Sequence, residues 1–348
     1  MVTPNILFLS FLISFSLALL TILTRNIHGR LTYDTFDGVQ KIHSIPTPRI
    51  GGLGITISSV ILAFFLYPAS LMSTIIICSA PIFIAGFIED INKNVRPIIR
   101  LLLAFISGII FVYVTDYRIE RIDLFPIDYL LSIYIVSLIF TTFCIGGVIN
   151  SINIIDGFNG LASGSLIIML ITFSYISFCV GDLELMSLCL NFSAIIFGFF
   201  IFNFPYGKIF LGDGGAYFCG FVLVTIAIML PTRNPDLSPW LSLLICAYPI
   251  LETIVSIVRK TKRKGHNAGM PDKLHLHMLV HRDLARKVSK SLKVYHLRNS
   301  TTSVIMWVLP LSHSLFAILF YDKIVIILVS IIISYFTYVY IYKKCTFK

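Results

Sequence analysis

The chain has 348 residues, of which 57% are hydrophobic and 13% are charged, and its formal net charge is +10. Charged residues make up about a quarter of a typical soluble domain. The composition therefore excludes an ordinary soluble protein and predicts an all-α, polytopic integral membrane protein. The seven cysteines lie almost all within apolar runs and form no CxxC pair, so we expect neither disulfides nor a cysteine metal centre.

Apolar runs long enough, or nearly so, to cross a bilayer predict about eleven transmembrane helices. They cover approximately residues 6–23, 50–67, 71–88, 98–114, 129–149, 161–180, 185–204, 216–230, 239–258, 303–320 and 324–342. The first run has no basic segment before it and no small-residue cleavage site after it, so we expect a retained span. An odd number of spans places the two ends of the chain on opposite sides of the membrane.

Lysine and arginine are concentrated in the loops after the odd-numbered spans and in the C-terminal tail. By the positive-inside rule these loops are cytoplasmic, so the N-terminus is expected in the periplasm and the C-terminus in the cytoplasm. The sequence thus predicts a single transmembrane domain, residues 1–348, with cytoplasmic loops at about 24–49, 89–97, 150–160, 205–215 and 259–302. Clusters of glycine, histidine or amide residues occur in these loops and not in the outer ones. We therefore expect the functional site on the cytoplasmic side.

The third cytoplasmic loop reads NSINIIDGFNGL over residues 150–161. A bilayer offers no partners to such polar groups, so their position between two apolar runs indicates a hydrated, protein-lined site. If the preceding helix continues to its end, Asn150, Asn153 and Asp156 project to one side at i, i+3 and i+6. The same spacing continues to Asn159. The alternative interpretation is a polar loop with a helix cap.

The first loop ends in KIHSIPTPRIGG, where Lys41, His43 and Arg49 could bind an anion such as a phosphate or form a basic loop beside the membrane. The second loop follows Glu89 and Asp90, which end a helix and do not share a face. Carboxylates are unfavourable at a helix C-terminus, so this pair suggests a cation or a catalytic task. A solvated charged turn is the alternative.

The fourth loop reads FLGDGG and places Asp213 among three glycines, just before an apolar helix. The carboxylate could cap that helix. The glycines also remove steric bulk around it, as a metal that bridges to a diphosphate would require.

The last loop contains PDKLHLHM, with His275 and His277. Zinc binding is the less favoured interpretation, because no cysteine is near. Contacts to phosphate fit the surrounding arginines better. Glu252, within the ninth predicted span, is a further buried acid, for which a hydrogen bond to a neighbouring helix is the simplest explanation.

Taken in order, the motifs PTPRIGG, GFIED, NSINIIDGFNGL, FLGDGG and PDKLHLH resemble those of the polyprenyl-phosphate N-acetylhexosamine-1-phosphate transferase family. The resemblance covers nearly the whole chain, and the eleven-span topology is similar to the N-acetylglucosamine-type branch. It implies transfer of a sugar 1-phosphate from a UDP-sugar to undecaprenyl phosphate at the cytoplasmic leaflet of the bacterial inner membrane. The products would be UMP and an undecaprenyl-diphosphate sugar that starts a surface glycan such as O-antigen, with Mg²⁺ or Mn²⁺ as cofactor.

The resemblance also implies roles for individual residues. Asp213 and Asp156 match metal-binding positions, and Glu89 and Asp90 match the paired acids, one of which deprotonates or positions the lipid phosphate. Substrate contacts are expected from Lys41, His43, Arg49, Lys93, Asn150, Asn153, Asn159, His275 and His277. The chain departs from the pattern where it has Glu89 and Asn159 in place of aspartates and Met278 in place of a histidine.

A secondary transporter is the competing prediction, because many spans and buried charges suit one equally. Transporters place polar residues near the middle of the membrane and often show internal repeats, whereas here the polar clusters lie at one interface and no halves repeat. We expect the partners to be a UDP-sugar, undecaprenyl phosphate and membrane lipid, with no nucleic acid. Analogy with the muramoyl branch suggests a homodimer, and the donor sugar stays open.

Overall fold

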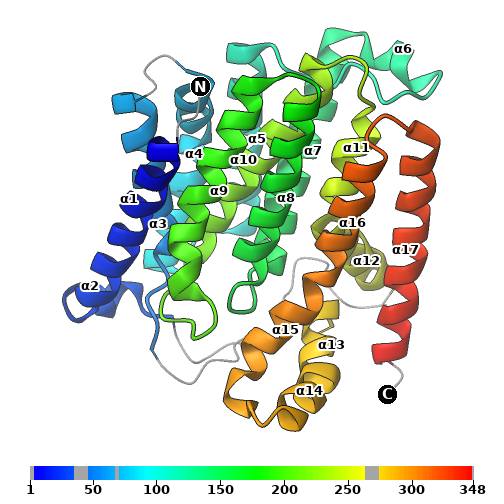
Figure 1. Cartoon of the computed structure of the whole chain (residues 1–348). Helices are drawn as coiled ribbons and strands as arrows, with labels where there is room; N and C mark the ends of the chain where they lie inside the picture. Colours follow the sequence, from blue (N-terminus) through cyan, green and yellow to red (C-terminus); the bar gives the residue numbers. More distant parts are fainter. Residues whose placement is uncertain (1–3, 35–45, 67–69, 263–273, 347–348) are drawn as a thin grey trace.

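The computed structural model of the chain describes residues 4–34, 46–66, 70–262 and 274–346. These residues form a bundle of helices (Figure 1), and no β-strand occurs among them. An isolated antiparallel bridge joins Tyr33 to Pro48 at the two sides of the first loop. The predicted all-α class is therefore confirmed.

The long helices are α1 (Pro4–Leu23), α4 (Leu71–Asn92), α5 (Pro97–Thr115), α7 (Tyr134–Ile155), α8 (Leu161–Cys179), α9 (Leu183–Asn203), α10 (Gly212–Arg233) and α17 (Ile324–Thr346). The shorter α-helices are α2 (Arg25–Thr32), α3 (Gly51–Ile61), α6 (Ile127–Leu131), α11 (Pro239–Ile245), α12 (Ala247–Lys262), α13 (Leu276–Val280), α14 (Arg286–Ser291), α15 (Arg298–Met306) and α16 (Val308–Leu319). Two π-helical turns, η1 (Leu62–Leu66) and η2 (His281–Ala285), and the 3₁₀ turn η3 (Tyr295–Leu297) complete the described elements.

Within the described ranges, nine helices are long and apolar enough to cross a membrane, when η3, α15 and α16 are counted as one span. Helices α11 and α12 would form a tenth span that is bent by 79° at a short break. These ten coincide with predicted spans. The remaining prediction, residues 50–67, corresponds to α3 and the start of η1, an apolar helix over Gly51–Phe65 that is shorter than the others. The chain is a polytopic membrane protein.

Local sequence explains where several helices begin and end. The Ser70 hydroxyl accepts a hydrogen bond from the first turn of α4, and the Asp182 carboxylate does the same for α9. Pro97 occupies the first turn of α5, where its missing N–H costs nothing. Lys93 ends α4 in the left-handed conformation with φ 55°.

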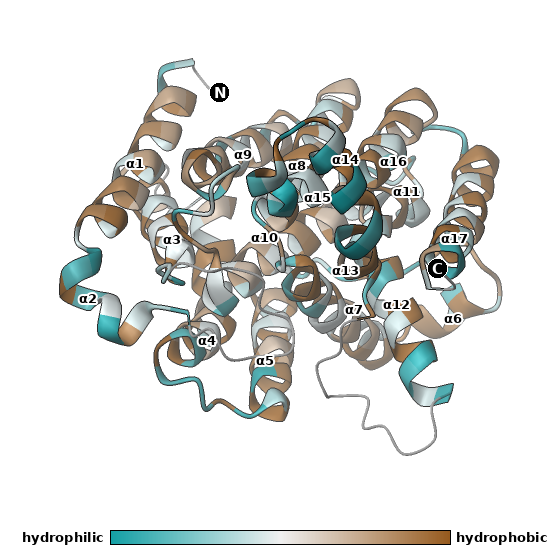
Figure 2. Cartoon of the chain, turned by 90° about the horizontal axis from the view of Figure 1, so that it is seen from below, coloured by the Kyte–Doolittle hydropathy of each residue, from teal (hydrophilic) through white to brown (hydrophobic). Residues whose placement is uncertain are grey.

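The two termini lie at opposite ends of the bundle, as an odd number of crossings requires (Figure 1). The loop after α7, the loop before α10 and helices α13 to α15 all lie at the end that carries the C-terminus. Figure 2 shows this end, with hydrophilic segments on α2, α14 and the last part of α12. Which end faces the cytoplasm stays a prediction from charge.

Helix α10 is the centre of the bundle and packs against α3, α4, α7 and α8. Of its most apolar 18-residue stretch, 89% is buried inside the protein. Glycines allow the closest approaches. A Cβ atom on Gly52 would lie 2.1 Å from the Cα of Gly215, and one on Gly86 would lie 2.6 Å from the Cα of Gly214. Backbones of α3 and α4 therefore touch the first turn of α10, which brings the first, second and fourth loops to one place.

Candidate active site

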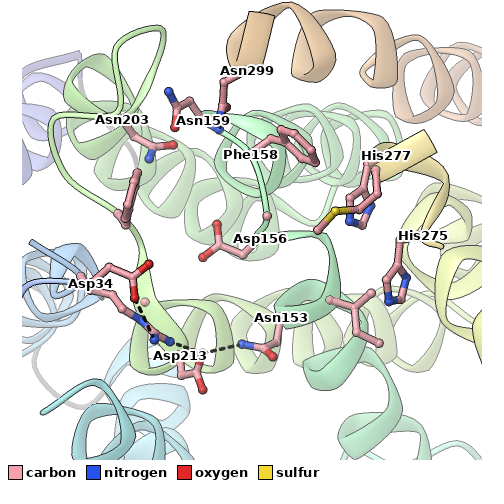
Figure 3. A pocket seen from close by; sticks show the side chains of 16 residues that line it. Asp34, Asn153, Asp156, Phe158, Asn159, Asn203, Asp213, His275, His277 and Asn299 are labelled. Carbon is pink, nitrogen blue, oxygen red and sulfur yellow. Dashed lines mark hydrogen bonds and ion pairs between the residues drawn. The ribbon is translucent and has the colours of Figure 1, made fainter. Parts of the chain in front are cut away.

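A cavity of about 280 Å³ opens at this end of the bundle (Figure 3). Its wall comes from the first, third and fourth loops and from α13, segments far apart in the sequence. The lining residues that carry polar side chains are Asp34, Arg49, Asn153, Asp156, Asn159, Asn203, Asp213, His275, His277 and Asn299. The structure thus brings together seven of the residues that the motifs predict.

Asp213 lies in the first turn of α10, and both of its carboxylate oxygens are engaged. Oδ1 accepts hydrogen bonds from Arg49 at 2.8 Å and from Asn153 at 3.1 Å. Oδ2 accepts from Arg100 at 2.6 Å. These donors come from the first loop, α7 and α5, so one carboxylate joins three separate segments. The preceding Gly212 has φ +77°, a conformation that few other residues adopt.

Arg49 stands between three carboxylates. Besides Asp213, its guanidinium lies 3.3 Å from Asp90 and 3.6 Å from Asp34. Burial alone would lower the pKa of Arg49, but attraction from these acids outweighs it and raises the pKa above its ordinary value. Arg49 is therefore a fixed positive charge beside the cavity.

Glu89 and Asp90 have separate partners, as their adjacent positions on α4 predict. Asp90 is buried and caps α10 from outside: its two oxygens accept the backbone N–H groups of Asp213 at 2.8 Å and Gly214 at 2.9 Å. Glu89 accepts the N–H of Val95 at 2.7 Å and so holds its own loop. Neither side chain lines the cavity, and the catalytic roles predicted for them stay predictions.

Asp156 follows the last residue of α7 and points into the cavity (Figure 3). Burial, and then repulsion from Asp213, raise the pKa of Asp156 to about 7, although Arg49 acts in the opposite direction. The charge of Arg49 thus offsets only part of the cost of burying this carboxylate. Among the described residues, no side chain or backbone group donates a hydrogen bond to it.

Two carboxylates facing one cavity fit a hard divalent cation, because Mg²⁺ is commonly bound by one or two carboxylates together with substrate phosphates and water. Asp156 and Asp213 are the residues that would hold it. The part of the chain that the structure describes has no group of three or more His, Cys, Asp or Glu side chains arranged around a metal position. An ion at this site would therefore depend on oxygens of the substrate to complete its ligands.

The third loop is held in place by amides that the motifs did not single out. Asn203 accepts the N–H of Gly160 at 2.7 Å, and Asn299 accepts the N–H of Asn159 at 2.7 Å. Asn159 in turn donates to the carbonyl of Pro205 at 3.1 Å. The loop is thereby tied to α9, to the fourth loop and to α15.

His275 and His277 lie at the start of α13 with their rings stacked, 5.3 Å between centroids and 4° between planes. Both rings face the buried Glu252 of α12, whose Oε1 lies 3.2 Å from Nδ1 of His275. Oε1 also accepts the backbone N–H of Leu276 at 2.7 Å. The bond of Glu252 to a neighbouring segment is thus as expected, and its partner is the histidine motif.

Some predicted residues lie elsewhere. Lys93 donates to the carbonyl of Tyr33 at 3.0 Å, and Asn150 donates to the carbonyl of Gly146 at 2.9 Å on its own helix. Neither lines the cavity. Lys41 and His43 fall outside the described residues, so their predicted contacts stay predictions.

Asp34 and Arg100 are site residues that the sequence analysis missed. Arg100 lies near the start of a predicted span, and a charge inside an apolar run is itself a signal of function. Asp34 offered no comparable signal, since it is one of two acids, with Asp37, in a basic loop outside the five motifs.

Comparison with known proteins gives this site its context. The family model for glycosyl transferase family 4 matches residues 72–231. The chain is similar to a probable undecaprenyl-phosphate N-acetylglucosaminyl 1-phosphate transferase of Bacillus subtilis (strain 168), with 30% identity over 264 residues, 73% of this chain and 70% of the relative.

Two streptococcal relatives are phospho-N-acetylmuramoyl-pentapeptide-transferases. The protein of Streptococcus pyogenes serotype M6 is 30% identical over 250 residues, 66% of this chain and 72% of the relative. That of Streptococcus thermophilus (strain CNRZ 1066) is 31% identical over 195 residues, 52% of this chain and 55% of the relative. The match to the Bacillus protein covers more than two thirds of both chains, and both kinds of relative are enzymes that transfer phosphosugars. The chain therefore belongs to glycosyl transferase family 4, the polyprenyl-phosphate sugar-1-phosphate transferases, as its five motifs predict.

Proposed function

We propose that this enzyme transfers an N-acetylhexosamine 1-phosphate, or a related acetamido sugar 1-phosphate, from a UDP-sugar to undecaprenyl phosphate. The products are undecaprenyl-diphosphate sugar and UMP. The observation that carries the proposal is the cavity itself, in which Asp156 and Asp213 face Arg49, Asn153 and His277 at one end of a membrane bundle. The reaction joins two anions, and such a site offsets their repulsion.

The charged and the neutral residues of the cavity have different roles in this proposal. Arg49 supplies a fixed cation beside the carboxylates, and a Mg²⁺ or Mn²⁺ ion held by Asp156 and Asp213 would polarise the diphosphate. Asn153 and the two histidines offer hydrogen-bonding groups to the sugar nucleotide. Asp90 fixes the start of α10, and with it the position of Asp213.

A second cavity, of about 520 Å³, suits the polyprenyl chain. It runs along α7, α10, α11 and α12, and its wall is mostly apolar, with Phe143, Val148, Ile254 and Ile257 among the lining residues. Phe143, Ile254 and Ile257 are also exposed on the outside of the bundle, as expected for a groove that opens sideways into lipid. The groove extends from the segment 118–121 after α5 to Ser151, which lies on α7 two residues before Asn153 of the site.

We further propose that the site faces the cytoplasm in the bacterial inner membrane and that the product starts a surface polysaccharide such as O-antigen. The N-acetylglucosaminyl 1-phosphate group in the name of the Bacillus relative makes UDP-N-acetylglucosamine the first candidate donor. A transporter would need a solute path through the bundle, whereas the relatives named above are transferases. A homodimer stays a prediction.

The test is transfer by the purified protein. Undecaprenyl phosphate is incubated with one radiolabelled UDP-sugar at a time, with Mg²⁺, with Mn²⁺ or with a chelator, and the extracted lipid and UMP are measured. We expect a metal-dependent lipid product from one acetamido donor, and a loss of at least about 100-fold in Asp213→Asn. Asp116→Asn, a matched change in an exposed carboxylate of an outer loop, should keep full activity. No lipid product with any donor, from folded protein, would contradict the proposal.

A further inference from the structure

Glu252 lies on the broken span, α12, where its carboxylate is 1% exposed. A carboxylate so deep in the protein is costly unless every oxygen has a partner. Oε1 has two, the N–H of Leu276 and Nδ1 of His275. Oε2 faces Nδ1 of His277 at 3.5 Å, and neither of these two atoms makes a hydrogen bond to another described residue. One oxygen thus anchors the chain, and the other faces the imidazole of His277, with the buried Tyr338 side chain also near the Glu252 carboxylate.

The opposite edge of the same imidazole faces the cavity. A Cβ atom on Gly157, next to Asp156, would lie 3.6 Å from Nε2 of His277. Phe158 meets the ring edge-on with 5.6 Å between centroids, and His275 stacks on its face. The ring is therefore held between its neighbours, with Nδ1 toward Glu252 and Nε2 toward the third loop.

We propose that Glu252 is a positioning residue, which keeps a hydrogen on Nδ1 of His277 and so presents Nε2 to the bound sugar nucleotide. The proposal rests on the proposed function for the identity of that ligand. A carboxylate only accepts hydrogen bonds, so the nitrogen that faces it must carry the hydrogen. The ligand then decides whether Nε2 carries a hydrogen. Nε2 accepts a hydrogen bond from a ligand hydroxyl when the ring is neutral, and it donates one to a phosphate oxygen when the ring is protonated.

The variant Glu252→Gln separates this role from a structural one. An amide oxygen in the place of Oε1 preserves the bonds to Leu276 and His275. The amide nitrogen then takes the place of Oε2, so that a donor faces Nδ1 of His277. Nδ1 of His277 must then accept a hydrogen bond, so the ring hydrogen moves from Nδ1 to Nε2. The change is expected at His277 and not at His275.

The measurement is ¹⁵N NMR of the full-length protein with labelled histidine, which has eight rings. The His277 signals are assigned by their loss in His277→Asn. In the wild type we expect hydrogen on Nδ1 of His277, and in Glu252→Gln a shift to the Nε2–H form with His275 unchanged. Equilibrium binding of UMP is measured on the same samples, and we expect it to weaken about tenfold in Glu252→Gln.

Glu184→Gln, the same chemical change at an exposed site in the first turn of α9, should alter neither signal nor binding. Glu252→Asp, which keeps the charge, should keep the Nδ1–H form. An unchanged His277 spectrum in Glu252→Gln, or a wild-type ring with hydrogen on Nε2 alone, would overturn the proposal. Wild-type protein that binds no UMP would instead contradict the proposed function, while the ring spectrum would still decide the role of Glu252.

Discussion

Arg100 and Asp213 are 113 positions apart, yet a guanidinium nitrogen of Arg100 lies 2.6 Å from Oδ2 of Asp213. Arg49 holds the other oxygen of the same carboxylate at 2.8 Å. Both arginines therefore contact the carboxylate that would hold the proposed divalent cation, and at least one of them would have to move for the ion to bind. The diphosphate of the proposed donor would then be the natural new partner of the displaced guanidinium.

Replacing Arg100 by alanine should have two opposite effects. Loss of a positive charge next to Asp213 should tighten Mn²⁺ binding about tenfold, because repulsion between the two cations is removed. Transfer activity should fall at least about 100-fold, because the diphosphate loses a charged contact. Mn²⁺ binding is measured by electron paramagnetic resonance in the presence of UMP. Arg96→Ala removes an exposed arginine at the N-terminal cap of the same helix and should change neither quantity. Weaker Mn²⁺ binding in Arg100→Ala would contradict this account.

The two acids at the end of α4 should respond unequally. In Asp90→Asn, one of the two oxygens that cap α10 becomes an amide nitrogen facing an N–H group, which should cost about 1 to 3 kcal/mol of stability and displace Asp213. Glu89→Asp only shortens the reach to Val95, so its losses should be small. Thermal unfolding and transfer rates of both variants provide the comparison. Equal, small losses would show that neither acid is needed at the site.

The contact between α3 and α10 should tolerate no side chain at Gly52. A methyl group there would meet the backbone of Gly215, and neither helix can yield without moving the site, so we expect Gly52→Ala to lose about 1 to 3 kcal/mol. Gly54→Ala is the matched control on the same helix, because its Cβ would be 3.5 Å from the nearest atom. Thermal unfolding in detergent measures both, and similar melting temperatures would show that the helices adapt.

The apolar groove can be blocked from α7. Gly147 lines it, and a Cβ at this position meets no atom within 4 Å, so a leucine there would extend into the groove without disturbing the packing. We expect Gly147→Leu to raise the KM for undecaprenyl phosphate about tenfold and to leave the KM for the UDP-sugar unchanged. Equal KM values for the lipid in wild type and variant would place the polyprenyl chain elsewhere.

The protein should become less stable in mild acid through His281. Burial, and then the charge of Arg298, lower the pKa of His281 to about 4 from 6.5. Between these pKa values the unfolded chain binds a proton that the folded chain does not. The free energy of unfolding therefore decreases as the pH falls through this range, and the contribution of His281 is complete only above it. The loss should reach about 2 kcal/mol. Melting temperatures from pH 7 to 4 should drop less in His281→Gln than in the wild type or in His296→Gln, an exposed histidine; identical pH profiles would exclude His281 as the cause.

Much of this architecture could be predicted from the chain because hydrophobic runs and charged loops are local signals. Ten spans and the position of the third-loop cluster are as expected, and Asn153, Asp156 and Asp213 do meet. The capping of α10 by Asp90 could not be predicted, since it joins residues 123 positions apart through the packing of two helices. Arg100 lies within a predicted apolar span, and none of the five motifs includes it. The α11–α12 break was not predicted, because residues 239–258 form one continuous apolar run, although Pro249 cannot donate to the carbonyl of Ile245 and is a local signal for a break there.

That break has a consequence for how the enzyme meets its substrates. Helices α11 and α12 both line the apolar groove together with α7 and α10, so the bend of 79° lies along its wall, where Ile254 and Ile257 are exposed. In the reaction proposed above, a lipid acceptor that uses this groove would enter by lateral diffusion within one leaflet and would never have to leave the membrane. The encounter is then two-dimensional, and turnover should follow the mole fraction of acceptor in the bilayer, whereas the water-soluble donor obeys its bulk concentration.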